Sequence, residues 1–365
     1  MTGFAHDLPF GAQVQPDGRV RFRLWAPGQE HVSLVLEPQE SPLPLQRDED
    51  GWFELTTELA QAGSRYCYQL PSGMRVPDPA SRQQAESVHG LSVVVDPLGY
   101  DWRSAAWRGR PWIEAVLYEL HTGTFSDSGD YAGVQRKLDW LAELGVTAIE
   151  LMPVADFSGT RNWGYDGVLP FAPARPYGTP DQLKALIDSA HERGLMMFLD
   201  VVYNHFGPDG NYLGQYAPQF FTDRHYTPWG AAIDFTQPPV REFFIHNALY
   251  WLNEFRFDGL RLDAVHAIRD DSPTHILTDL AARVRNACGP DRHVHLVLEN
   301  DANQASFLGL PRYDAQWNDD FHHASHVVVT RESEGYYVDY QRDPLAAPGR
   351  ALAQGFVYQG DSSIH

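Results

Sequence analysis

The stretch with the clearest chemical potential is residues 257–266, which read FDGLRLDAVH. If this stretch forms a strand, its two leucines lie on one face and Arg261 and Asp263 on the other, because side chains alternate between the faces of a strand. A buried strand tolerates such charges only when they are paired or used in chemistry. Two interpretations stand at this point: a structural ion pair inside a barrel, or part of an acid–base site.

The elements around this stretch alternate between strand and helix. Short apolar runs predict further strands at residues 115–120, 146–152, 195–202 and 294–299. Apolar residues at helical spacing predict helices near 134–144, 179–194 and 239–255, and another that starts at Ser272-Pro273. Repeated βα units of this kind predict parallel strands joined by right-handed crossovers.

The placement of acidic residues distinguishes a closed barrel from an open doubly wound sheet. Asp200, Asp263 and Glu299 each stand at or near the carboxyl end of a different strand, which is how a (β/α)8 barrel distributes its active site. The first strand is not followed by the glycine-rich turn of a dinucleotide-binding sheet. We therefore predict an α/β fold in which residues 106–365 form a TIM-type barrel.

Residues 1–105 have the pattern of a separate all-β sandwich. Val20, Phe22 and Leu24 alternate with arginines, and similar alternation recurs near residues 32–36 and 66–70. Turn signals such as Asp50-Gly51 separate these runs. No catalytic cluster is indicated here, so we expect a module that packs beside the barrel.

Composition narrows the class of partner. The chain has 365 residues and a net charge of −20, which argues against nucleic acid and anionic membranes as partners. Aromatic residues make up 13%, which suits a protein that stacks against sugar rings. The two cysteines, Cys67 and Cys288, lie far apart and predict neither a disulfide framework nor a zinc site. Without a secretory signal or a membrane-spanning run in the sequence, we predict a cytoplasmic protein.

Two loops are rich in aromatic residues. The connection after the third strand, about residues 203–238, is the longest and holds several aromatic side chains. Long loops of this kind are usually lids or binding elements. The loop after the second strand contains NWGYDG at 162–167, so Trp163 and Tyr165 are candidates for stacking against sugar. The alternative is that these rings only cap the mouth of the barrel.

Three short motifs resemble, in order and spacing, those of the α-amylase family of glycoside hydrolases. They are DVVYNH at 200–205, GLRLDAVH at 259–266 and LEN at 298–300. The stretch RLWAP at 23–27 is similar to the domain that precedes the barrel in branching enzymes, isoamylases and trehalohydrolases. VLYELHTGTF at 116–125, LVLEND at 296–301 and NDDFHH at 318–323 are similar to the trehalohydrolase branch of the family.

The resemblance implies roles for individual residues. Asp263 would be the nucleophile, and Glu299 would protonate the leaving oxygen and then activate water, which requires carboxyl groups roughly 5–5.5 Å apart. Arg261, with Asp200 as a second partner, would keep the nucleophile ionised. The expected sugar contacts are His205 and His266 in the first subsite and Asp319, Asp320, His322 and His323 at the trehalose end.

One feature departs from the family pattern. A further Asn-His-Asp motif, expected near a seventh strand, is not found in residues 335–365, and only about six strands are predicted. An unclosed barrel has two unpaired strand edges and an incomplete core. Three alternatives are open: a fragment, a naturally split enzyme whose second chain supplies the missing strands, and a truncated product.

These observations together predict a retaining glycoside hydrolase that uses no metal or organic cofactor. It is expected to cleave the α-1,4-glucosidic bond next to the terminal trehalose unit of maltooligosyltrehalose. The alternatives are a glucan branching or debranching enzyme of the same family, and a catalytically incomplete glucan-binding fragment.

Overall fold

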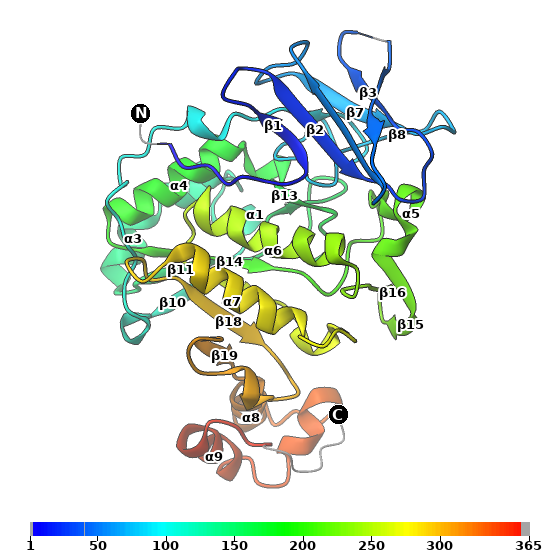
Figure 1. Ribbon diagram of the computed structural model, residues 1–365. Helices are drawn as coiled ribbons and strands as arrows, with labels where there is room; N and C mark the ends of the chain where they lie inside the picture. Colours follow the sequence, from blue (N-terminus) through cyan, green and yellow to red (C-terminus); the bar gives the residue numbers. More distant parts are fainter. Residues whose placement is uncertain (1–2, 40, 359–365) are drawn as a thin grey trace.

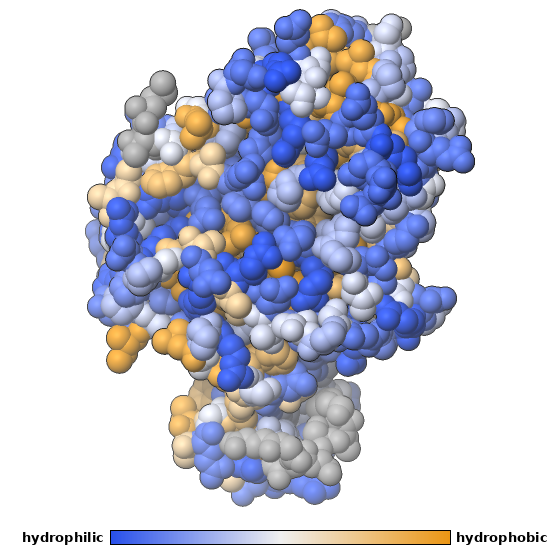
Figure 2. All heavy atoms as spheres, in the orientation of Figure 1, coloured by the Kyte–Doolittle hydropathy of each residue, from blue (hydrophilic) through white to orange (hydrophobic). Residues whose placement is uncertain are grey.

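The computed structural model describes residues 3–39 and 41–358. Residues 359–365, which belong to the segment searched for a further motif, lie outside this part. Figure 1 shows an N-terminal β module above a layer of parallel strands and helices, with a smaller group of helices at the C-terminal end. The face in Figure 2 is largely hydrophilic. Within the described residues, no helix combines the length and apolar character that a membrane crossing requires.

The N-terminal module is built from two antiparallel sheets, as predicted. One contains β1 (Gly11–Val14), β2 (Val20–Trp25), β6 (Trp52–Thr57) and β5 (Gln46–Arg47). The other contains β4 (Leu43–Pro44), β3 (Ser33–Leu36), β7 (Arg65–Gln69), β8 (Arg75–Val76) and β9 (Ser92–Val93). The alternation in β2 buries Phe22, whose ring packs edge-on against Tyr66 of the opposite sheet at a centroid distance of 4.9 Å.

The second part is a six-stranded sheet in which every pairing is parallel. The strands follow chain order: β10 (Leu117–Leu120), β11 (Ala148–Leu151), β14 (Met196–Val201), β17 (Gly259–Leu262), β18 (His295–Glu299) and β19 (Ala315–Trp317). Consecutive parallel strands of this kind form part of a (β/α)8 barrel, so the predicted fold is confirmed.

Helices connect these strands along the outer face (Figure 1). They are α1 (Thr122–Phe125), α2 (Tyr131–Gln135), α3 (Leu138–Leu144), α4 (Pro180–Glu192), α6 (Pro238–Asn253) and α7 (Ile276–Cys288). Thr179 starts α4 with a reciprocal capping box that includes Gln182, as the sequence indicates. The start of α7 differs from the prediction at Ser272. The Asp270 carboxylate accepts hydrogen bonds from the N–H groups of Ser272 and Ile276, which keeps the residues between them in a turn.

The aromatic insertion at 203–238 is ordered and only partly a surface feature. It contains α5 (Leu213–Tyr216), the short 3-10 helix η4 (Pro218–Phe220) and a hairpin of β15 (Phe221–Thr227) and β16 (Gly230–Ile233). Tyr216 and Phe220 are buried, whereas Tyr226 is exposed. The backbone N–H of Gly28 donates to the Tyr216 carbonyl, so this insertion also joins the N-terminal module. A second small hairpin pairs β12 (Ala155–Asp156) with β13 (Leu169–Pro173).

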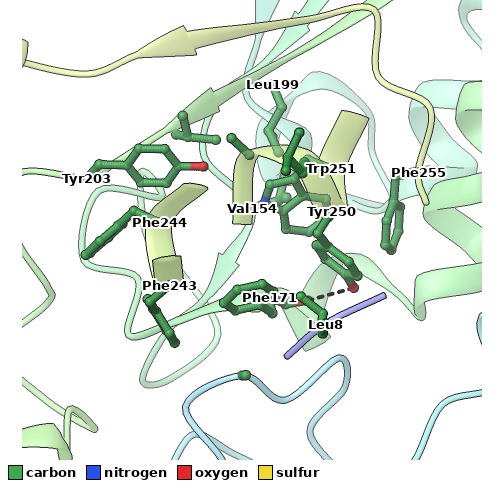
Figure 3. Close-up of a cluster of buried hydrophobic side chains, with 14 of the residues drawn as sticks. Leu8, Val154, Phe171, Leu199, Tyr203, Phe243, Phe244, Tyr250, Trp251 and Phe255 are labelled. Carbon is green, nitrogen blue, oxygen red and sulfur yellow. Dashed lines mark hydrogen bonds between the residues drawn. The ribbon is translucent and has the colours of Figure 1, made fainter. Parts of the chain in front are cut away.

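The N-terminal module and the barrel part share one continuous apolar core. In Figure 3, Leu8 from the N-terminal segment lies beside Phe171 of β13 and Tyr250 of α6. The Tyr250 hydroxyl donates to the Phe171 carbonyl at 2.9 Å. The sequence predicted a boundary between residues 105 and 106, and this division stays a prediction, because the core runs through both parts.

A separate small core lies at the C-terminal end. It is made by α8 (Asp319–Thr330), the 3-10 helix η7 (Gly335–Tyr340) and α9 (Ala346–Gln354). Ala324 and Val327 of α8 pack there against Tyr340 and Ala351.

A buried ion pair fastens the N-terminal module to α6. Arg82 and Glu254 have side chains that are 3% and 1% exposed and meet at 3.2 Å. The Arg82 guanidinium also donates to the carbonyls of Ala12 and His6, and Glu254 accepts the His6 N–H. A paired charge of this kind is stable only while its partner is present.

We expect Glu254→Ala to lower the free energy of unfolding by about 3–5 kcal/mol, because it leaves the Arg82 guanidinium buried without its counter-charge. Urea unfolding measures this loss. Asp17→Ala, which removes an exposed ion pair with Arg19, is the matched control and should change stability little. Equal losses in the two variants would contradict the role given to the buried pair.

Candidate active site

The inner face of the parallel sheet carries the polar residues. Leu260 and Leu262 of β17 pack in the outer core beneath the helices, whereas Arg261 lies on the opposite face, so the predicted alternation is confirmed. Below Arg261, the Phe198 ring fills the space beside Gly259. A Cβ at residue 259 would come within 2.2 Å of this ring, so glycine is required there.

The centre of the site is the guanidinium of Arg261, which binds three carboxylates. Its Nη1 lies 2.8 Å from Asp200 Oδ2 and 2.9 Å from Asp263 Oδ1. Its Nη2 lies 3.0 Å from Glu299 Oε2. The three acids come from β14, the residue after β17, and the last residue of β18, so adjacent strand ends bring them to one cation.

Ala264 connects the two acids predicted to be catalytic. Its backbone has a left-handed conformation with φ +42°, which is uncommon for a residue with a side chain. In this conformation its N–H donates to Glu299 Oε2 at 2.8 Å. The Glu299 carboxylate is therefore held directly beside the backbone of Asp263. Left-handed backbone costs roughly 1–2 kcal/mol for such a residue, which this hydrogen bond to a charged group helps to offset.

The acids perturb one another's protonation. Burial raises the pKa of Asp263 to about 8, and the nearby Asp200 charge and a hydrogen bond with Glu299 add to the rise. Burial likewise raises the pKa of Asp200 to about 7, although Arg261 opposes this shift. The sequence predicted that Arg261 keeps Asp263 ionised. The correction is that one guanidinium among several buried acids does not outweigh their burial and mutual repulsion.

The chain was compared with known proteins. The family model "Alpha amylase, catalytic domain" matches residues 116–232, and "Carbohydrate-binding module 48 (Isoamylase N-terminal domain)" matches residues 9–79. A malto-oligosyltrehalose trehalohydrolase from Deinococcus radiodurans is 44% identical over 96% of this chain and 57% of its own length. One from Saccharolobus solfataricus is also 44% identical, over 98% of this chain and 63% of its own length.

A solved structure is also similar to this chain. The crystal structure of a putative α-amylase from Salmonella typhimurium has a TM-score of 0.96 and 47% identity, and covers 98% of this chain and 62% of that one. The chain therefore has the fold of the α-amylase family and is similar in sequence to its trehalohydrolase members. It spans 57% and 63% of the lengths of the two trehalohydrolases that it matches.

Tyr165 is an aromatic residue that lies in the site. Its hydroxyl donates to Asp200 Oδ2 at 3.0 Å. Its carbonyl lies 2.9 Å from Nε2 of His205, whose Nδ1 lies 2.9 Å from Asn204 Oδ1. Both ring nitrogens of His205 thus have protein partners. The His205 ring stacks on Trp229 from the insertion at a centroid distance of 4.1 Å, so the structure gives His205 a supporting position behind Tyr165.

Trp163 and His266 lie farther from the Arg261 cluster. Trp163 is 71% exposed and borders a groove that is also lined by His121 and Tyr177. His266 lies on the 3-10 helix η5 (Val265–Ala267), and its Nδ1 is 3.1 Å from Asp301 Oδ1. The prediction that these two side chains contact sugar is not tested by the protein alone.

The four polar residues that follow β19 divide into two groups. Asp319 interacts electrostatically with the site: burial, followed by the charge of Glu299, raises its pKa to about 6, and His322 opposes this rise. Asp320 is instead buried in the C-terminal core, where it accepts hydrogen bonds from Tyr340 and from the N–H of Val357. His323 packs against the rings of η7. Hence Asp320, whose oxygens are already bonded within the protein, is not placed for the predicted substrate contact.

Three residues on the inner face of the sheet were not predicted from the sequence to belong to the site. Glu119 of β10 and Glu150 of β11 pair in register, and each offers an oxygen within 4.8 Å of one from Asp200. The Arg261 guanidinium lies 5.4 Å from the ring centroid of Trp317 in β19, a cation–π contact. Strand alternation was the available signal, since all three face inward with Asp200 and Arg261.

We expect stability to fall as pH rises from about 4 to about 8, because Asp263 retains its proton in the folded protein and loses it in the unfolded chain. Asp263→Asn should remove much of this loss and exceed the wild type in stability at pH 8 by more than about 1.4 kcal/mol, the equivalent of one pKa unit. Thermal unfolding across this pH range measures the difference. Glu58→Gln, at an exposed carboxyl, is the control; parallel curves for Asp263→Asn and wild type would refute the assignment.

Proposed function

We propose that this chain is the catalytic part of a retaining glycoside hydrolase that releases trehalose from maltooligosyltrehalose. The observation that supports this most directly is that Asp263 and Glu299, which stand at adjacent strand ends, both bind the guanidinium of Arg261. Two carboxyl groups beside one bond are the machinery of retaining glycosidases. The substrate in this proposal is the one named for the trehalohydrolase relatives, which match the chain over nearly all of its length.

In this proposal Asp263 attacks the anomeric carbon while Glu299 gives its proton to the leaving oxygen. The bond that forms joins a carboxylate oxygen of Asp263 to the sugar, and the bond that breaks is the glycosidic one. Glu299 then takes a proton from water, which hydrolyses the intermediate. This division needs one ionised and one protonated carboxyl, and the raised pKa of Asp263 keeps in the site a proton that Glu299 is proposed to receive when the substrate enters.

The remaining site residues are proposed to bind the sugar. Tyr165, fixed by its hydrogen bond to Asp200, is placed to stack against the ring in the first subsite, and His266 to donate to it. Trp163 extends the aromatic surface along its groove. Asp319 and His322 are proposed to contact the trehalose end. His205 is proposed to act on the first subsite through Tyr165. An α-glucan or maltooligosaccharide substrate fits the family.

A product assay tests the proposal. The protein that carries this chain is incubated with maltooligosyltrehalose and, separately, with amylose. Free trehalose from the first substrate is the expected result. New branch points in amylose would favour a branching enzyme instead, and cleavage of the α-1,6 bonds of a branched glucan, tested in a third incubation, would favour a debranching enzyme. Binding of both glucans without turnover would favour a glucan-binding role.

The two acids should differ in their response to the leaving group. Glu299→Gln is expected to lose activity on the natural substrate by about 10²–10⁴-fold, but far less on a glycoside whose leaving group needs no proton. Asp263→Asn is the matched variant and should lose both activities while it still binds sugar, because it keeps the shape of the side chain and lacks the nucleophile. Steady-state kinetics on both substrates measure this, and equal losses for Glu299→Gln on the two would argue against its acid role.

The proposal leaves two sequence predictions as they were. The cytoplasmic location and a second chain that supplies further strands stay predictions, and neither affects the chemistry of the Arg261 cluster.

A further inference from the structure

Glu150 is a buried acid for which the proposed chemistry has no use. It lies on the inner face of β11, is 0% exposed, and within the described part of the chain neither carboxylate oxygen has a hydrogen-bond partner. Buried polar groups are nearly always bonded, and a buried charge without a partner is very costly. An unpartnered Glu150 therefore calls for an explanation.

The groups that face Glu150 come from three strands. Glu119 lies beside it on β10, Asp200 on β14 and Arg261 on β17. The Arg261 guanidinium already contacts Asp200, Asp263 and Glu299, and it makes no hydrogen bond to Glu150. Burial raises the pKa of Glu150 well above its ordinary value, and the charges of Asp200 and Glu119 reinforce this.

The neighbouring Asp200 also has an unsatisfied atom. Asp200 uses Oδ2 to bind Arg261 and Tyr165, whereas its Oδ1 is buried and has no partner among the described residues. An oxygen of Glu150 and one of Asp200 lie within 4.8 Å of each other. That separation is spanned by one water with two hydrogen bonds of about 2.8 Å, or closed by a small side-chain rotation.

We propose that Glu150 is a positioning residue of the active site, an uncharged carboxylic acid that donates a hydrogen bond, directly or through one water, to the free Oδ1 of Asp200. Asp200 is thereby held as a carboxylate against Arg261 and Tyr165. Through Arg261, the same hydrogen bond fixes Asp263 and Glu299. This inference rests on the proposed function in that it assigns Glu150 to the glycosidic reaction of the same site.

Two variants separate this role from a structural one. Glu150→Gln keeps the shape and a donor N–H, so kcat/KM should stay within about threefold of wild type. Glu150→Met has a similar length and no donor, and should lower kcat/KM by about 10- to 100-fold, the loss expected for a hydrogen bond to a charged group. Only in Glu150→Met should the acidic limb of the pH–rate profile move to higher pH, because Asp200 is protonated more readily without the donor.

An infrared difference spectrum tests the protonation state without any substrate. The wild type minus Glu150→Gln spectrum at pH 7 should contain the C=O band of a protonated carboxylic acid. A carboxylate band in its place would overturn the proposal. So would equal impairment of Glu150→Gln and Glu150→Met together with loss of wild-type activity on treatment with EDTA, which would indicate an ionised metal ligand.

The two proposals fail in different ways. Kinetics are measured on whichever α-glucan the wild type cleaves, so absence of trehalose among the products refutes the proposed substrate and leaves the Gln and Met comparison intact. Unchanged kinetics in both variants would refute the role of Glu150 alone. If Glu150→Met fails to fold, the difference spectrum and the Glu150→Gln profile still decide the matter.

Discussion

The site depends on one cation that holds three acidic side chains from three strands. A guanidinium presents several donors in one plane, so it can bind carboxylates that arrive from different directions. Arg261 does this for Asp200, Asp263 and Glu299. The ends of β14, β17 and β18 must therefore keep their register, since a shift of one residue in any strand would turn its acid to the outer face.

The site contains more acidic groups than the single positive charge of Arg261 can neutralise. Glu119, Glu150 and Asp319 add to the three acids that Arg261 binds. Burial, reinforced by the charges of neighbouring acids, raises the pKa values of Asp200 and Asp263, and the protons that these carboxyls retain reduce the excess. A site that retains protons near neutral pH is suited to general acid chemistry.

Contacts outside the parallel sheet also hold the site residues in position. The shared apolar core and the buried Arg82–Glu254 pair attach the N-terminal module to α6, which covers the outer face of the strands. Trp229 of the insertion stacks on His205, and His205 in turn supports Tyr165. Tyr165 is thus held in place through several layers of packing.

The sequence determined the strand and helix order and the alternation that places Arg261 and Asp263 inside, because periodicity and motif spacing are local properties of the chain. Only the tertiary structure decided which acids have raised pKa values, since this depends on burial and on charges from other strands. It also separated Asp319 from Asp320: neighbours on a helix point about 100° apart, so one faces the site and the other the C-terminal core. Glu150 could not be identified from a sequence motif, because its burial and its acidic neighbours come from other strands.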